Sequence, residues 1–135
     1  MDLSIIIPCH NLEKYITPLL STLSNQKFDC SAELIFVCDN CTDNTEQVIL
    51  DWRNKLSQYE FYVIKDICGS CGQARNVGLQ GAQGKYIWFV DGDDWILGEF
   101  AIDLLFKTME GNNLSLLRFG YLSIYDSEWD WMMVW

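Results

Sequence analysis

The chain has 135 residues, of which 50% are hydrophobic, and 19 acidic residues against 9 basic ones give a formal net charge of −10. This length suits one domain with a proper core, and the hydrophobic content excludes a disordered chain. The acidic excess argues against a nucleic-acid ligand, because phosphate backbones are bound by Lys and Arg.

The opening Met-Asp-Leu-Ser has no signal-peptide pattern, and no apolar run reaches the ~20 residues of a membrane helix. We therefore expect a cytoplasmic domain without a transmembrane segment, with the inner face of the membrane as an alternative position. In that compartment the six cysteines are expected to be thiols or metal ligands rather than disulfides.

The first predicted elements are a short apolar strand over residues 3–7, which Pro8 closes, and a helix that begins at Pro18 with Thr17 as its N-cap. Residues 32–37 then have the apolar pattern of a second buried strand. The next helix is predicted to begin after Asp43, because Glu46 follows it at capping-box spacing.

A third strand is predicted over residues 61–64, and a short helix over 73–80. Gly78 and Gly81 are expected to let that helix lie close to the sheet. Residues 86–90 form an apolar run that predicts a strand buried on both faces.

The last predicted elements are an amphipathic helix over residues 96–111 and a fifth strand or hairpin arm over residues 114–125. Alternating strands and helices predict an α/β fold, with a Rossmann-like, mainly parallel sheet flanked by helices. If the strands lie in the order 3-2-1-4, with a further strand at the C-terminus, a crevice opens between strands one and four. Residues 8–11 and 91–94 then face each other across it.

Three carboxylates, those of Asp91, Asp93 and Asp94, follow the fourth strand directly. Asp91-Gly92-Asp93 offers two hard oxygen ligands, which suit Mg²⁺ or Mn²⁺ together with oxygens of a phosphate substrate. An acidic protein that binds phosphates needs such a cation to offset the repulsion. The alternative is a solvated turn; an EF-hand loop does not fit, because its sixth position is Ile96 rather than Gly.

Three segments, residues 4–11, 33–45 and 74–95, resemble the successive motifs of family 2 glycosyltransferases with the GT-A fold. The resemblance implies a nucleotide-sugar donor, usually a UDP-sugar, and a Mn²⁺ or Mg²⁺ ion that bridges its diphosphate to the Asp-x-Asp motif. It also implies inverting sugar transfer to the hydroxyl of a saccharide or lipid-linked acceptor.

The resemblance assigns nucleotide contacts to six positions, namely Pro8, His10, Asn11, Asp39, Arg75 and Asp91. Within this set Asp39 matches the acid that contacts the nucleobase, and residues 8–11 match the segment along the base and ribose. Arg75 matches the arginine after the third strand. For the metal, the resemblance implies Asp93 as the direct ligand and Asp91 as the acid near the ribose and metal.

The sequence departs from the family pattern at Cys38, Cys41 and His10, where Asp, Ser and Tyr are usual. The carboxylate base of the inverting step has no recognisable motif here, and Glu128 and Asp130 are read as surface residues. Residues 1–135 are therefore expected to form a single nucleotide-sugar-binding domain that lacks the acceptor-binding C-terminal part. The alternative function is a non-catalytic nucleotide-sugar-binding module or a truncated fragment.

Two further features stay open. Cys38, Cys41, Cys68 and Cys71 form two Cys-x-x-Cys pairs, which could form a thiolate metal site or a redox-active pair, or be small hydrophobic side chains. The Trp-rich end over residues 128–135 could pack on the sheet, bind an acceptor or partner, or mediate self-association.

Overall fold

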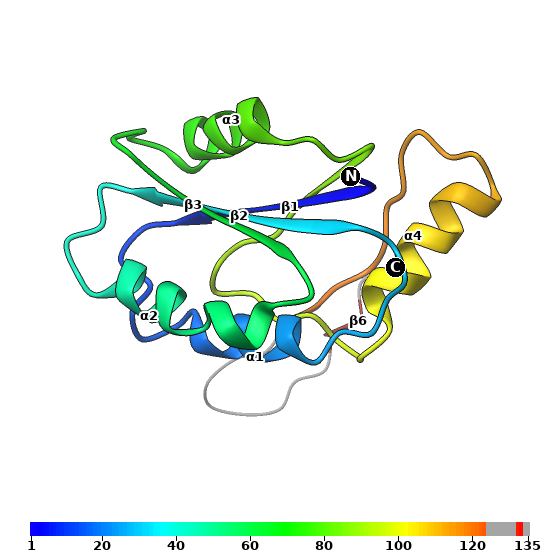
Figure 1. Ribbon diagram of the computed structural model, residues 1–135, viewed down its shortest axis with the longest axis horizontal. Coiled ribbons are helices and arrows are strands. Elements are labelled where there is room, and N and C mark those ends of the chain that lie inside the picture. The colour runs from blue at the N-terminus through cyan, green and yellow to red at the C-terminus, as the bar shows by residue number, and fades with distance from the viewer. Residues whose placement is uncertain (124–131, 134–135) are drawn as a thin grey trace.

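A four-stranded parallel sheet forms the centre of the molecule (Figure 1). The computed structural model describes residues 1–123 and 132–133. The strands lie in the order β3-β2-β1-β4 and pair in parallel, which confirms the predicted order. They are β1 (Leu3–Cys9), β2 (Ala32–Asp39), β3 (Glu60–Asp66) and β4 (Tyr86–Phe89).

Helices cover both faces of this sheet, with α3 on one face and α1 and α2 on the other (Figure 1). The helices are α1 (Thr17–Ser24), α2 (Thr45–Asp51), the 3₁₀ helix η1 (Arg53–Leu56), α3 (Cys71–Gly81) and α4 (Ala101–Gly111). A separate antiparallel pair joins β5 (Leu122–Ser123) to β6 (Met132–Met133). None of the helices described is long and apolar enough to cross a membrane.

The core lies on both sides of β1 and β2, which are buried along their whole length. On one face Ile6, Ile35 and Val37 pack against Ala74 of α3. Gly78 allows this contact, since a Cβ there would lie 2.4 Å from Ile6 Cγ2.

The predicted close approach at Gly78 is therefore confirmed, whereas the same prediction for Gly81 is wrong. A Cβ at Gly81 would lie 3.9 Å from Ile64 Cδ1, which is an ordinary van der Waals distance. The sheet therefore limits side-chain size at one of the two glycines.

The first strand and helix differ from prediction by one or two residues. β1 continues through Pro8, which pairs with Val37, because β2 runs beside it as far as Cys38. α1 is preceded by Ile16 rather than Thr17 as N-cap, without a side-chain cap. The reason is that the backbone is already helical at Ile16, whose N–H donates to Leu12 O at 3.0 Å.

The predicted capping box of α2 is wrong. Asn44 is the N-cap, and Asp43 accepts hydrogen bonds from Thr45 N at 3.0 Å and from Glu13 N at 3.0 Å. The Glu46 carboxylate lies 2.7 Å from Lys65 Nζ instead of returning to the cap. Asp43 therefore links the loop after β1 to the start of α2.

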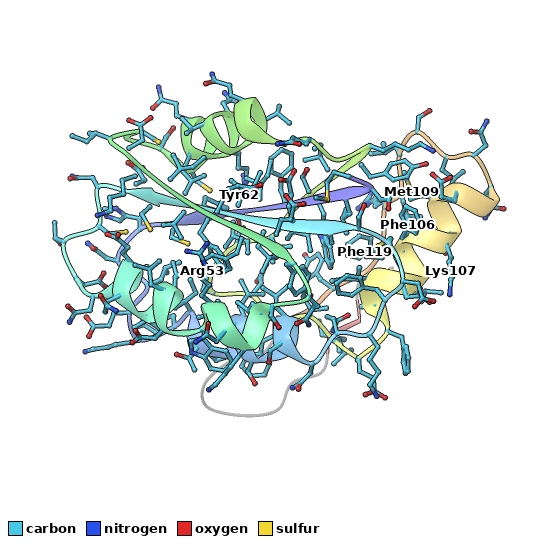
Figure 2. All side chains as sticks on the ribbon, in the orientation of Figure 1. Arg53, Tyr62, Phe106, Lys107, Met109 and Phe119 are labelled. Atoms are coloured by element: carbon cyan, nitrogen blue, oxygen red, sulfur yellow. The ribbon has the colours of Figure 1, made fainter. Side chains whose placement is uncertain are left out.

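β4 is an edge strand with one covered face, so the prediction of burial on both faces is wrong. Ile87 and Phe89 are 36% and 43% exposed, because α3 packs over β1 and β2 rather than over β4. On the other face Trp88 packs edge-on against Phe119 (centroids 5.7 Å apart), and Tyr86 against Phe106 of α4 at 6.2 Å (Figure 2).

The remaining C-terminal predictions are partly confirmed. α4 ends at Gly111 as expected but begins at Ala101, after an irregular segment held by the Gln26 side chain, which donates to Gly98 O at 2.6 Å. Of the strand predicted over 114–125, the structure describes β5 at its end. Most of the Trp-rich segment 128–135 lies outside the described residues.

Candidate functional site

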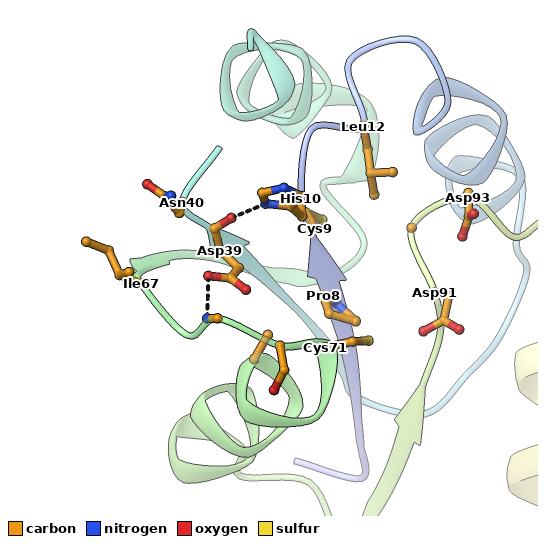
Figure 3. Close-up of a pocket in the computed structure, with 14 residues that line it drawn as sticks. Pro8, Cys9, His10, Leu12, Asp39, Asn40, Ile67, Cys71, Asp91 and Asp93 are labelled. Atoms are coloured by element: carbon orange, nitrogen blue, oxygen red, sulfur yellow. Dashed lines mark hydrogen bonds between the residues drawn. The ribbon is translucent and has the colours of Figure 1, made fainter. Parts of the chain in front are cut away.

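A cavity of about 470 Å³ opens at the carboxyl ends of β1, β2 and β4 (Figure 3). Its walls come from three strand ends, the loop after β3 and the first turns of α3. The lining residues are Pro8, Cys9, His10, Leu12, Asp39, Asn40, Ile67, Gly69, Ser70, Cys71, Ala74, Asp91, Gly92 and Asp93. Parallel α/β sheets bind ligands at such a position, where the strand order reverses.

At the end of β1, His10 is oriented by the backbone of β2. Its Nδ1 lies 2.7 Å from Asp39 O (Figure 3). Since a carbonyl oxygen can only accept, Nδ1 carries the hydrogen in this contact. The exposed ring of His10 is thereby fixed at the rim of the cavity.

Asn11 is one of two predicted nucleotide contacts, together with Arg75, that do not line the cavity. Its Oδ1 accepts hydrogen bonds from Thr42 N at 2.8 Å and Thr42 Oγ1 at 3.2 Å, and its backbone has a φ of 50°. Asn11 therefore joins the loops after β1 and β2, and its contact with a nucleotide stays a prediction.

Asp39, at the end of β2, is 8% exposed, and one of its oxygens is committed to the protein. Oδ1 accepts hydrogen bonds from Cys68 N at 2.7 Å and Gly69 N at 3.1 Å. Backbone N–H donors compensate a buried carboxylate well, so Asp39 holds the loop between β3 and α3. Its other oxygen, Oδ2, stays available to a ligand.

The sequence analysis considered the loop after β3 for its cysteines and not as a nucleotide-binding element, yet Ile67, Gly69 and Ser70 line the cavity. Gly69 has a φ of 78°, which favours glycine. Ser70 is the N-cap of α3 and accepts from Gln73 N at 3.2 Å. In the sequence, Gly69 and Ser70 are therefore the signals of an ordered turn at this position.

The opposite wall carries the acids of the Asp-x-Asp motif. Asp91 and Asp93 lie across the cavity from Asp39, with Pro8 between them (Figure 3). Gly92 leaves room at this turn, since a Cβ there would lie 2.4 Å from Leu12 Cδ1, so that the Leu12 side chain would have to shift, and 3.3 Å from Pro8 O. The structure thus brings the predicted base-binding and metal-binding acids to one cavity.

Arg75 reaches this wall from α3 without lining the cavity itself. Its Nη2 donates to Asp91 Oδ1, whereas its Nε is buried and has no hydrogen-bond partner. The guanidinium therefore has an unused donor beside the motif.

Negative charge is incompletely compensated at this edge. Burial, followed by the charges of Asp91 and Asp93, raises the pKa of Asp94 above its ordinary value. Three carboxylates and no Lys or Arg occur among the described lining residues. An anionic ligand entering this cavity therefore needs a cation with it.

The oxygens of Asp91 and Asp93 fit a hard divalent cation that takes its other ligands from water and phosphate. Within residues 1–123 and 132–133, no group of three or more His, Cys, Asp or Glu side chains is placed to hold a metal ion. A cation here would therefore take part of its coordination from a bound molecule.

The same observation counts against the predicted four-cysteine metal site. All six cysteines are free, and Cys9 and Cys38 meet instead as register partners on β1 and β2. Burial, followed by the charge of Cys41, raises the pKa of Cys38 to about 12. This thiol stays protonated at neutral pH, which fits a small apolar side chain.

Comparison with known proteins identifies the family. The model of glycosyl transferase family 2 matches residues 4–135. The chain belongs to this family. Its relatives include the poly(ribitol-phosphate) beta-N-acetylglucosaminyltransferase TarS of Staphylococcus aureus, 37% identical over 125 residues, with 84% of this chain and 22% of that protein covered. Another is the uncharacterised glycosyltransferase EpsJ of Bacillus subtilis, 31% identical, with 87% of this chain and 33% of that protein covered.

Solved structures show the same fold, a GT-A fold. The crystal structure of S. aureus TarS 1–349 in complex with UDP has a TM-score of 0.76 at 34% identity, covering 84% of this chain and 33% of that one. The corresponding UDP-GlcNAc complex has a TM-score of 0.67 at 35% identity, covering 84% and 30%. The chain thus spans about a fifth to a third of the length of these relatives.

Proposed function

We propose that this domain binds a nucleotide-diphosphate sugar, specifically a UDP-sugar, through a divalent cation, for inverting transfer of the sugar to an acceptor hydroxyl. The observation that carries the proposal is that Asp39, Asp91 and Asp93 line one cavity. The acceptor would be a saccharide or a lipid-linked saccharide, as the family resemblance implies.

The nucleobase would lie against Asp39 and His10. Asp39 Oδ2 is a free acceptor because Oδ1 is held by two backbone N–H groups, and a uracil ring offers an N–H donor that a carboxylate accepts well. The TarS structures in complex with UDP and UDP-GlcNAc support a nucleotide-sugar ligand, since they share the fold at about one-third identity.

The diphosphate would lie toward Asp91 and Asp93, with Mn²⁺ or Mg²⁺ held by their carboxylates. When bound, such an ion neutralises the charge that develops on the leaving diphosphate. The protein's own contribution is to hold the two acids at the cavity wall, on the tight turn that Gly92 permits. The catalytic base is left unassigned, so the alternative is a domain that binds the donor without transferring its sugar.

Calorimetric titration with UDP, with and without Mn²⁺, tests this proposal. We expect binding that depends on Mn²⁺ and is lost in Asp93→Ala. Asp51→Ala is the matched control, because it removes an acid of α2 that hydrogen-bonds Gln47 and takes no part in the cavity.

UDP binding that is equal with and without Mn²⁺, or that survives in Asp93→Ala, would contradict the metal-dependent proposal. Incubation with UDP-GlcNAc and Mn²⁺ then separates the two functions. Release of UDP by the protein, and not by Asp93→Ala, supports turnover, whereas tight binding without release supports a donor-binding module.

A further inference from the structure

Asp91, one of the two predicted metal ligands, forms an ion pair with Arg75. Its Oδ1 accepts a hydrogen bond from Arg75 Nη2. Of the ion pairs in the described part of the chain, this is the one that reaches the acidic wall of the cavity; the others join Lys27, Lys65, Lys85 and Lys107 to surface acids. A cation that binds Oδ1 of Asp91 therefore competes with Arg75.

Arg75 is itself incompletely satisfied in this arrangement. A guanidinium has five N–H donors in a planar fork, and the Nε–H of Arg75 is buried without a partner. Buried donors are nearly always paired in folded proteins, and exceptions call for an explanation such as an absent ligand. The contact with Asp91 thus leaves a donor that a ligand oxygen would complete.

We propose that Asp91 exchanges its partner when the donor binds. Resting on the function proposed above, the inference is that the divalent cation takes the Asp91 carboxylate from Arg75. The released guanidinium then donates its Nε–H and one terminal N–H to oxygens of the nucleoside diphosphate. Arg75 thereby pairs with Asp91 before the donor binds and contacts the diphosphate of the donor afterwards.

The exchange keeps the charges of Arg75 and Asp91 paired in both states. A cation alone would leave the guanidinium without its carboxylate, and a nucleotide alone would leave Asp91 uncompensated beside Asp93. Each ligand is therefore disfavoured alone and favoured in the presence of the other. Binding of cation and nucleotide is reciprocally coupled as a result.

The variant Arg75→Gln separates this exchange from a purely structural role of Arg75. Free Mn²⁺ measured by electron paramagnetic resonance gives the affinity for the ion alone, which we expect to rise by about 3- to 10-fold because its competitor is gone. UDP affinity at saturating Mn²⁺, measured by calorimetry, is expected to fall by about tenfold, since charge-assisted hydrogen bonds to the diphosphate are lost. Lys107→Gln, which breaks an exposed ion pair on α4 (Figure 2), should change neither affinity.

If Arg75 only holds Asp91 in place for the metal, Arg75→Gln weakens Mn²⁺ binding instead of strengthening it, and the exchange is overturned. If the wild-type protein does not bind UDP in the presence of Mn²⁺, the proposed function itself fails and the exchange fails with it. Mn²⁺-dependent UDP binding by the wild type therefore tells the two failures apart.

A measurement on the wild-type protein avoids dependence on the folding of a variant. The Nε–H signal of Arg75 in ¹H–¹⁵N spectra, assigned by its loss in Arg75→Lys, is expected to shift when Mg²⁺ and UDP are both added and to stay in place with either alone. An equal shift with UDP alone, or no shift with both, would overturn the exchange.

Discussion

At the scale of single residues, the site depends on how Asp39 divides its two carboxylate oxygens. One is held by the backbone of the loop after β3 at Cys68 and Gly69, and the other is free to accept from a ligand. The loop offers only N–H donors, so the amide oxygen of an asparagine at this position could replace Oδ1. Its NH₂ group could not replace Oδ2, because NH₂ donates and does not accept.

We therefore expect Asp39→Asn to reverse base preference rather than only to weaken binding. Its amide oxygen would stay with the loop, and its NH₂ would face the ring N–H of uracil, donor against donor. UDP affinity should fall by about tenfold or more, as for an unpaired polar contact, while the ratio of CDP to UDP affinity rises. Competition binding checks this, with Asp66→Asn as the control, because Asp66 accepts from its neighbour Ile67 N at 2.7 Å.

The candidate site was predictable where side chains follow strand ends directly. Asp39, Asp91 and Asp93 stand at positions where a parallel sheet collects its ligands, so sequence pattern and motif spacing sufficed to bring them together. The contribution of the loop after β3 was not predictable, because this loop acts through backbone N–H groups whose direction depends on the fold of the loop. The contact between Asn11 and Thr42 was not predictable for a related reason: Asn11 Oδ1 accepts a hydrogen bond from Thr42 N in the loop after β2, and no local pattern reveals such a contact.

At the scale of elements, the number, type and order of the main strands and helices followed from hydrophobic periodicity, whereas burial of β4 did not. A run such as Tyr86–Phe89 looks the same at a sheet edge as at its centre, and only the position of α3 decides that Ile87 and Phe89 are exposed. Capping failed at α2 because Asp43 is used by the neighbouring loop at Glu13. Tertiary contacts, absent from a local pattern, decided both.

The position of α3 leads to a stability prediction at Gly78. Gly78→Ala should destabilise the fold by about 1–3 kcal/mol, because its Cβ would meet Ile6 Cγ2 at 2.4 Å and Val37 Cγ2 at 3.2 Å. Gly72→Ala, in the same helix with nothing within 4 Å of its Cβ, should stabilise it by up to about 1 kcal/mol. Urea unfolding followed by circular dichroism measures both, and equal effects at the two glycines would refute the packing argument.

At the scale of the whole molecule, 19 acidic residues stand against 9 basic ones. Asp94, which lies beside two other acids, shows how this excess makes the free energy of unfolding depend on pH. The pKa of Asp94 is raised above its ordinary 3.8, first by burial and then by Asp91 and Asp93. Between the unfolded and folded pKa values the native state binds more protons than the unfolded state. The contribution of Asp94 to stability therefore falls as pH rises through that interval and stays unfavourable at neutral pH.

Asp94→Asn is accordingly expected to be more stable than the wild type at pH 7, by no more than about 0.5 kcal/mol, since solvent screens this exposed group. The difference should vanish below pH 3.8, and Mn²⁺ should reduce it at pH 7 by compensating the neighbouring acids. Denaturant unfolding at both pH values checks this, with Asp51→Asn as the matched variant. A gain that persists in acid would show that charge is not its cause.

The position of the protein in the cell and its self-association through the Trp-rich end stay predictions. The family assignment concerns residues 4–135, and the relatives extend well beyond the matched part. The activity of the whole protein therefore stays a prediction.

The acid-lined cavity has a kinetic consequence. A free nucleotide, itself an anion, approaches a surface of like sign, so its encounter rate without the ion should rise with ionic strength as that repulsion is screened. Ion and nucleotide arriving as one complex carry less negative charge, and their association should respond to salt more weakly.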